Sequence, residues 1–349
     1  MKVAVVLGTR PELIKLAPVL RALKERKIKY IMIRTGQHYS NNMWARFMTE
    51  LNIPFEGGIG GHNLQVHNCN HGKMVGLMMQ RMDPTLTKEK PDLVIVQGDT
   101  NSGLAGALTA AKLGIPVAHI EAGMRSYDKR QPEEINRVVM DHLATYLFPA
   151  TPEQWINLQK EGLIPHNHKE HIVGNTIVDA IKSIKIKSGR PIDEKYAFVT
   201  FHREENVDCP ATLLKMMNGI MRIEQELKLK IIFPVHPRTK QKLTELGINH
   251  PSLVEPMGYA ECLQYQKHAA VCITDAGGLV EESCILGTPS VVVRYKTDRP
   301  EAEKWGASIT VGEISADNIL KATKEALELK FKGHPYGEDV TDKILEVLL

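Results

Sequence analysis

The sequence has few cysteines, little net charge and no long apolar run. Its five cysteines are odd in number and scattered along 349 residues, at positions 69, 209, 262, 272 and 284. Such a set does not form a disulfide framework, which favours a reducing compartment. The net charge is only +3 with neutral histidines, so nothing indicates a surface that binds nucleic acid.

Segments that direct a chain to a membrane are also missing from the sequence. No apolar run approaches the roughly 20 residues that span a bilayer. The opening residues MKVAVVLGTR contain an apolar run that is too short for the core of a signal peptide. We therefore expect a cytoplasmic protein without a membrane or nucleic-acid partner.

The length and the apolar composition are sufficient for two domains. Hydrophobic residues make up 43% of the 349 residues, enough for two buried cores. Charge and polarity rise near residues 175–191, and a new series of apolar runs follows. We expect a first domain at 1–175 and a second at 190–335, with a last helix at about 338–349 that packs back on the first.

The stretch from Leu93 to Asp141 predicts a strand, a helix, a second strand, a loop and a second helix. The apolar runs 93–96 and 116–120 are typical of buried strands, whereas Ala and Leu recur at helical spacing over 104–113. This order of elements is that of a parallel sheet covered by helices.

Three carboxylates in this stretch stand at the ends of the predicted elements. Asp99 and Glu121 follow the two strands, and Glu133 lies where the second helix begins. Ligands of open α/β sheets bind at the carboxyl ends of the strands, so the three side chains could converge. In the alternative, Asp99 and Thr100 form an ordinary turn and helix cap, and Glu133 only complements the helix dipole. Glu121 is expected to be partly buried, which needs a compensating partner.

The first strand and helix predict an anion site. The strand 3–7 ends in Gly8, and Pro11 suits the first turn of a helix. Arg10 at the helix start and Lys15 one turn further add two cations to the helix N-terminus. The alternative is that Arg10 and Lys15 are surface charges.

A histidine-rich stretch follows the second strand, which itself ends near Gln37 and His38. Between residues 61 and 71 it contains four side chains of types that bind metals, His62, His67, Cys69 and His71. Their spacing matches no common zinc pattern, and a glycine-rich active-site loop would have the same residues, so we expect no metal there.

The second half repeats the alternation of strands and helices. Apolar runs at 197–201, 230–235, 271–274 and 289–293 each end in polar residues. Gly277 and Gly278 open a helix after one of these strands, where backbone N–H groups are free to bind a diphosphate. Glu282, about one turn later, is placed to bind ribose hydroxyls. In the alternative, Glu281 and Glu282 only complement the helix dipole.

The fold class predicted from these patterns is α/β, with two Rossmann-like, doubly wound domains. If the two domains face each other, the polar strand ends of both line one interdomain cleft.

Seven motifs spread along the chain resemble those of a known family. They are GTRPELIKLAPV (8–19), GDTNS (98–102), HIEAGMRS (119–126), PEEINR (132–137), TFHREEN (200–206), TDAGGLVEE (274–282) and TDRPEA (297–302). In this order they are similar to the motifs of the non-hydrolysing UDP-N-acetylglucosamine 2-epimerases, and the resemblance covers nearly the whole chain.

The resemblance implies a GT-B fold and, usually, a homodimer. It implies reversible interconversion of UDP-N-acetylglucosamine and UDP-N-acetylmannosamine, in the supply of precursors for cell-surface polysaccharides. No cofactor, neither nicotinamide nor metal, is implied.

The resemblance also assigns roles to individual residues. It implies catalytic roles for Asp99, Glu121, Glu133 and His202, of which His202 contacts the diphosphate. It implies substrate binding by Arg10, Lys15, Arg137, Ala276, Gly277, Gly278, Glu282 and Arg299. Ala276 replaces the serine that the family usually has, so one hydroxyl to phosphate is missing.

The implied chemistry accounts for several acids in one site. The proton on sugar carbon 2 is barely acidic, so a concerted route removes it while UDP leaves carbon 1. Carbon 2 is inverted when UDP adds back to carbon 1 and a proton is delivered to the opposite face of carbon 2. This reaction needs a base, an acid and cations that hold the diphosphate. Two alternatives remain open: a GT-B glycosyltransferase that uses a UDP-sugar donor, and a non-catalytic nucleotide-sugar sensor.

Overall fold

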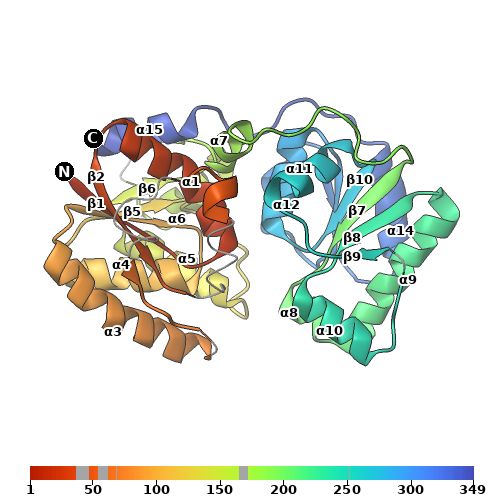
Figure 1. The fold of residues 1–349 in the computed structure, drawn as a ribbon, viewed down its shortest axis with the longest axis horizontal. Coiled ribbons are helices and arrows are strands. Elements are labelled where there is room, and N and C mark those ends of the chain that lie inside the picture. The colour runs from red at the N-terminus through yellow and green to blue at the C-terminus, as the bar shows by residue number, and fades with distance from the viewer. Residues whose placement is uncertain (37–46, 54–61, 68, 165–171, 251) are drawn as a thin grey trace. The chain divides into compact units, whose positions relative to one another are not determined.

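The computed structural model describes residues 1–36, 47–53, 62–67, 69–164, 172–250 and 252–349. The chain divides into two compact units. The first consists of Met1–Ser183 and Tyr336–Leu349, and the second of Ile184–Pro335. In each unit helices cover a central sheet (Figure 1).

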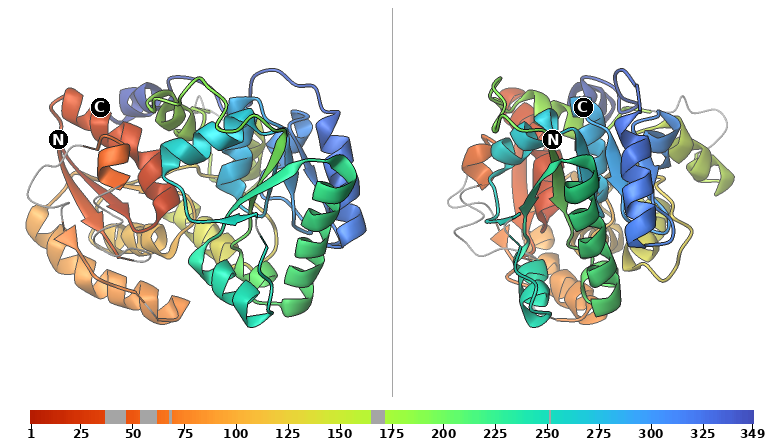
Figure 2. Two further views of the ribbon diagram at one scale, coloured as in Figure 1. Left: turned by 45° about the vertical axis from the view of Figure 1, so that its right-hand side comes forward. Right: turned by 90° about the vertical axis from the view of Figure 1, so that its right-hand side faces the viewer.

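The first unit alternates strands and helices along the chain. Its elements are β1 (Lys2–Leu7), α1 (Arg10–Glu25), β2 (Lys29–Arg34), β3 (His62–Asn63), α3 (His71–Glu89), β4 (Leu93–Gln97), α4 (Asn101–Lys112), β5 (Val117–Ile120), α5 (Pro132–Leu143), β6 (Tyr146–Phe148), α6 (Pro152–Lys160), α7 (Ile177–Lys182) and α15 (Val340–Leu348). The C-terminal helix α15 lies against α1 and α7 (Figure 2).

The sheet of the first unit is parallel and doubly wound. Its strand order is β3-β2-β1-β4-β5-β6, in which the direction of winding reverses between β1 and β4. Every residue of β4 and β5 is buried. Such strands are apolar on both faces because helices cover both sides of the sheet.

The second unit has the same architecture. Its elements are β7 (Tyr196–Thr200), α8 (Glu204–Val207), α9 (Pro210–Leu227), β8 (Lys230–Pro234), α10 (Pro237–Glu245), β9 (Leu253–Val254), α11 (Tyr259–His268), β10 (Val271–Thr274), α12 (Gly277–Leu286), β11 (Ser290–Val292), α13 (Pro300–Lys304), β12 (Ser308–Thr310) and α14 (Ala316–Leu327). The order β12-β11-β10-β7-β8-β9 repeats that of the first sheet, with the reversal between β7 and β10.

The predicted fold class is thus confirmed: each unit is a Rossmann-like, doubly wound α/β structure. Ligands of such sheets bind where the winding reverses, beyond the carboxyl ends of the two central strands. In the first unit this point lies beyond β1 and β4, and in the second beyond β7 and β10. Within the described part of the chain, no helix has both the length and the apolar composition needed to cross a membrane.

Candidate active site

Glu121 lies at the end of β5 and is held by three donors. Its Oε1 atom is 2.7 Å from the Lys15 ammonium and accepts a hydrogen bond of 3.2 Å from Asn175. The Gln97 side chain donates to Oε2. Because Lys15 and Glu121 are each only 4% exposed, Lys15 is no surface charge, and that alternative is wrong. The donors supply the compensation that a buried carboxylate needs.

The backbone of Glu121 is in an unusual conformation. Its φ is +71°, in the left-handed region that residues with a side chain rarely adopt. The neighbouring strand holds it there, since the N–H groups of Glu121 and Ala122 both donate to the carbonyl of Phe148 at the end of β6. Backbone strain of this kind concentrates at functional sites, which favours a functional role for Glu121.

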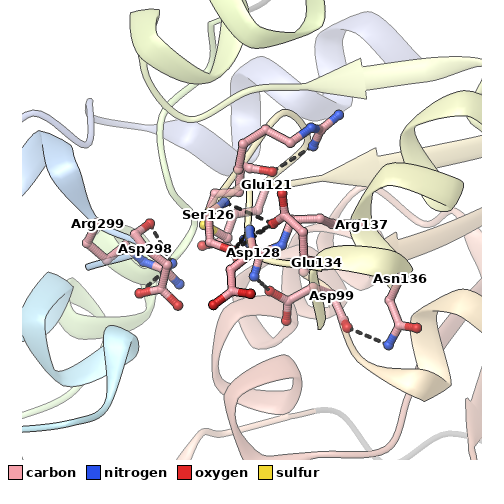
Figure 3. Close-up of polar contacts among 12 residues, drawn as sticks. Asp99, Glu121, Ser126, Asp128, Glu134, Asn136, Arg137, Asp298 and Arg299 are labelled. Atoms are coloured by element: carbon pink, nitrogen blue, oxygen red, sulfur yellow. Dashed lines mark hydrogen bonds and ion pairs between the residues drawn. The ribbon is translucent and has the colours of Figure 1, made fainter. Parts of the chain in front are cut away.

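Asp99 lies beyond the end of β4 and pairs with Arg137 of α5. The guanidinium of Arg137 donates to Asp99 and lies 3.1 Å from a carboxylate oxygen of Glu134 (Figure 3). The side chain of Asn136 donates to the backbone carbonyl of Asp99. Thr100, not Asp99, caps α4, by accepting from the N–H of Gly103. The predicted turn and helix cap at Asp99 and Thr100 are thus present, and the pairing of Asp99 with Arg137 is an additional feature.

The two adjacent glutamates that open α5 differ in their surroundings. Glu134 is buried and accepts hydrogen bonds from the N–H groups of Ser126 and Tyr127, which fixes the loop before the helix. Glu133 is half-buried in the first turn of α5, a position that fits both a catalytic role and interaction with the helix dipole.

Arg10 is half-buried at the start of α1. Its guanidinium carbon lies 4.7 Å from the centre of the Phe47 ring, the geometry of a cation–π contact. Lys15, five residues further along the same helix, faces Glu121 instead. Sequence reasoning placed both cations at one anion site, whereas the structure gives them different neighbours.

Glu12 is a site residue that sequence reasoning missed. Its side chain is completely buried and accepts hydrogen bonds from the N–H groups of Gly8 and Thr9. The other carboxylate oxygen accepts from the hydroxyl of Thr100, 2.7 Å away. Glu12 therefore joins the turn after β1 to the turn after β4, across the point where the winding reverses. The pattern Thr9-x-x-Glu12 is that of a capping box and was the available signal.

His119 and Asp141 were also missed. His119 lies within β5, and both of its ring nitrogens have partners: Nδ1 is 2.7 Å from Asp141 of α5, and Nε2 is 2.7 Å from the carbonyl of Gly98. Asp141 also accepts hydrogen bonds from Arg125 and from the N–H of Gly123. Histidine within an otherwise apolar strand was the signal in the sequence.

Asp275 organises the turn after β7 in the second unit. This buried carboxylate follows β10 and accepts hydrogen bonds from the N–H groups of His202 and Arg203 and from the side chain of Asn206. It plays the part in the second unit that Glu12 plays in the first, since each joins the turns on the two sides of the reversal point. The His202 side chain is exposed, and its Nδ1 atom lies 3.6 Å from a carboxylate oxygen of Asp275.

The N-terminus of α12 lies beside Asp275. Ala276 precedes the helix and donates its N–H to the hydroxyl of Thr274, while Gly277 and Gly278 form the first turn. A Cβ atom on Gly277 would lie 3.0 Å from a carboxylate oxygen of Asp298, which is closer than side chains normally pack. A Cβ atom on Gly278 would meet nothing within 4 Å.

The carboxylates of α12 do not act on the helix dipole. The helix begins at Gly277, so Glu281 and Glu282 lie beyond its first turn, and the dipole alternative is wrong. Arg299 donates to Glu281, and both side chains are buried. Glu282 is buried and accepts from Gln266 of α11 at 2.9 Å.

Three arginines gather around Asp298 near the start of α12. Arg294 lies 3.0 Å, Arg203 3.5 Å and Arg299 3.5 Å from its carboxylate oxygens. Arg299 also pairs with Glu281, and Arg294 lies 3.9 Å from Glu205, so the three arginines of this cluster are shared among three carboxylates. Of these three arginines, sequence reasoning named only Arg299.

The histidine-rich stretch does not form a metal centre in the described part of the chain. His71 bonds to Asn101 at 3.0 Å, and His62 lies 3.6 Å from Glu89. Among the residues that the structure describes, no three His, Cys, Asp or Glu side chains come together as metal ligands. Gln37 and His38 lie outside the described residues.

Comparison with known proteins supplies the family. The family model described as UDP-N-acetylglucosamine 2-epimerase matches residues 21–349. The UDP-N-acetylglucosamine 2-epimerase of Methanocaldococcus jannaschii is 42% identical over 100% of this chain and 99% of its own. The UDP-2,3-diacetamido-2,3-dideoxy-D-glucuronate 2-epimerase of Pseudomonas aeruginosa is 34% identical over 97% and 96%.

Solved structures agree with the sequence comparison. The M. jannaschii enzyme in complex with UDP-GlcNAc and UDP matches with a TM-score of 0.91, at 42% identity over 100% of this chain and 99% of that one. The Neisseria meningitidis enzyme bound to UDP-GlcNAc matches with a TM-score of 0.87, at 28% identity over 100% and 99%. From the sequence motifs, the two Rossmann-like units and these matches, we conclude that the chain belongs to the UDP-N-acetylglucosamine 2-epimerase family.

Proposed function

We propose that the chain inverts carbon 2 of a UDP-N-acetylhexosamine, converting UDP-N-acetylglucosamine reversibly into UDP-N-acetylmannosamine. The observation that carries the proposal is the pairing of Glu121 with Lys15 and of Asp99 with Arg137, at the ends of neighbouring strands of the first unit. Two acids fixed by two cations suit proton transfer on a sugar beside a departing anion.

The reaction is an elimination followed by an addition. A carboxylate takes the proton from carbon 2, the bond from carbon 1 to the diphosphate oxygen breaks, and a double bond forms between the two carbons. UDP then adds back to carbon 1 while an acid delivers a proton to the other face of carbon 2. We propose that Asp99, Glu121 and Glu133 share these proton transfers, with Arg137 and Lys15 holding two of them in place.

The second unit is proposed to bind the diphosphate and the nucleoside. The first N–H groups of α12, at Gly277 and Gly278, can donate to phosphate oxygens, and the exposed His202 adds a further donor. Ala276 offers only its backbone. We propose that Glu282 binds the ribose hydroxyls and that Arg299 contacts the diphosphate.

The relatives differ in the sugar nucleotide for which they are named. The M. jannaschii relative is named for UDP-N-acetylglucosamine and the P. aeruginosa relative for a diacetamido uronate. We favour the N-acetylhexosamine because the relative named for it is more similar in sequence, at 42% against 34% identity. We further propose that the protein acts in the cytoplasm as a homodimer and needs no metal or nicotinamide.

The test is to incubate the purified protein with UDP-N-acetylglucosamine and no acceptor, and to follow the sugar nucleotides by NMR. The proposal predicts a mixture with UDP-N-acetylmannosamine that is also reached from the other side. Free N-acetylmannosamine and UDP would indicate a hydrolysing enzyme instead. If the substrate binds but stays unchanged, a glycosyltransferase or a sensor is the better account, and a panel of UDP-sugars then tests the substrate.

A further inference from the structure

His119 has hydrogen-bond acceptors at both ring nitrogens. The partner of Nδ1 is a carboxylate oxygen of Asp141, and the partner of Nε2 is the backbone carbonyl of Gly98, each at 2.7 Å. The side chain is completely buried, so no solvent replaces either partner. A neutral imidazole has only one N–H, whereas a carbonyl oxygen can only accept. Both bonds therefore require the doubly protonated imidazolium.

The surroundings of His119 stabilise this charge. Burial by itself lowers the pKa of His119. The Asp141 carboxylate and the Gly98 carbonyl nevertheless raise this pKa above its ordinary value, and Glu121, next to the same strand, adds to the increase. Asp141 is shared with Arg125, which also pairs with Glu161 at the end of α6. Two cations lie near His119, and each is matched by a carboxylate: Arg125 pairs with Asp141, and Lys15 pairs with Glu121.

The two bonds of His119 join the three segments that carry the proposed acids. Glu121 lies two residues after His119 on β5. The Gly98 carbonyl belongs to the turn that holds Asp99, and Asp141 belongs to α5, whose first turn contains Glu133. Asp141 also accepts from the N–H of Gly123, which fixes the loop after Glu121.

We propose that His119 is a positioning residue which, as a buried imidazolium, fixes the segments of Asp99, Glu121 and Glu133 relative to one another. The proposal rests on the proposed function, because those acids are the groups it positions. His119 itself has both nitrogens occupied by protein acceptors and transfers no proton. A neutral His119 could donate only one hydrogen bond. Either the Gly98 turn or α5 would then lose its bond to His119, and the distances between the acids would change.

The protonation state can be observed without any turnover. In protein labelled with ¹⁵N at histidine, the His119 signals are identified by their loss in His119→Gln. We expect both ring nitrogens of His119 to bear a proton at pH 7 to 8. The matched control is His142→Gln, one residue after Asp141 on α5, whose exposed ring should leave the His119 signals unchanged when it is replaced.

Kinetics then test the positioning role. His119→Gln can keep only one of the two bonds, and kcat should fall by roughly a hundredfold through misplacement of the acids. UDP affinity, measured by calorimetry, should stay unchanged, because the proposed UDP contacts lie in the second unit. Asp141→Asn should move the alkaline fall of kcat to lower pH, because His119 loses its proton more easily without the carboxylate. A role in stability alone would leave that part of the pH profile in place.

Two results would overturn the proposal. One is a single protonated ring nitrogen on His119 in the unaltered protein at pH 7. The other is a folded His119→Gln or Asp141→Asn protein with the kcat and pH profile of the unaltered one. Absence of epimerisation by the unaltered protein would count against the proposed function instead, since the NMR result does not depend on turnover.

Discussion

The Lys15 ammonium and the Glu121 carboxylate form an ion pair 2.7 Å apart inside the first unit, with almost no contact with solvent. Removing one member leaves an uncompensated buried charge, which costs about 3–5 kcal/mol. Lys15→Met and Glu121→Gln should therefore each destabilise the protein by an amount of this order, measured by chemical denaturation. The double variant should be more stable than the sum of the single effects predicts. Additive losses would show that the two groups do not interact.

Asp99→Asn should lower kcat by roughly a hundredfold or more, because the amide can neither take nor deliver the proton at carbon 2. The fold should persist, since Asn keeps the oxygen that accepts from Arg137. The matched control is Asp83→Asn on the exposed side of α3, with kcat expected to be unchanged. Steady-state rates of epimerisation provide the comparison. Near-normal turnover in Asp99→Asn would remove Asp99 from the proposed mechanism.

Glu12 should make stability depend on pH. Burial raises the pKa of its carboxyl from 4.5 to about 6 in the folded state, against the hydrogen bonds from Thr100, Gly8 and Thr9, which lower it. The folded state therefore binds this proton more tightly than the unfolded state does. The Glu12 contribution should fall by about 2 kcal/mol as the pH rises from about 4.5 to about 6.

Glu12→Gln should remove that dependence. An amide can accept from the N–H groups of Gly8 and Thr9 through its oxygen and donate to the Thr100 hydroxyl through its nitrogen. Unfolding free energies at several pH values should show the difference between the two proteins growing over this range. Glu25→Gln, at the exposed end of the same helix, is the control. Parallel pH curves for Glu12→Gln and the unaltered protein would contradict the raised pKa.

The position of the acids could be read from the sequence because strand ends are local features. Short apolar runs followed by Asp99 and Glu121 were enough to place both residues at one edge of a parallel sheet. The partners of these acids could not be read in the same way. Lys15 and Glu121 are 106 residues apart, and only the packing of α1 against the sheet brings them together.

The sequence also could not show how the surroundings of two adjacent glutamates differ. Glu133 and Glu134 both suit the first turn of a helix, and which one points inward depends on how α5 is rotated against the sheet. The same holds for Glu281 and Glu282, whose partners Arg299 and Gln266 come from other elements. The capping box of Glu12 was visible, whereas its bond to Thr100 needed the fold.

The start of α12 should tolerate no side chain at its first residue. In Gly277→Val the Cβ atom would crowd a carboxylate oxygen of Asp298 at 3.0 Å and the guanidinium carbon of Arg299 at 3.2 Å. UDP affinity, measured by calorimetry, should fall by more than a factor of about ten, or ~1.4 kcal/mol. The control is Gly189→Ala, where a Cβ atom meets nothing within 4 Å. Unchanged affinity in Gly277→Val would place the diphosphate elsewhere.

Ala276→Ser should strengthen the same contact. A hydroxyl at this position can donate to a phosphate oxygen, and a neutral hydrogen bond contributes about 0.5–1.5 kcal/mol. We expect tighter UDP binding in calorimetry, with a matching gain for the UDP-sugar. Weaker binding would mean that the added hydroxyl points into the helix instead of toward the ligand.

Exchange with heavy water tests most directly the central claim, that carbon 2 is deprotonated while UDP departs. The protein is incubated with UDP-N-acetylglucosamine in deuterium oxide, and carbon 2 of both sugar nucleotides is examined by NMR and mass spectrometry. The account predicts one deuterium at carbon 2 in UDP-N-acetylmannosamine, and its gradual appearance in the recovered substrate. UDP-N-acetylmannosamine that forms with hydrogen still on carbon 2 would contradict the account.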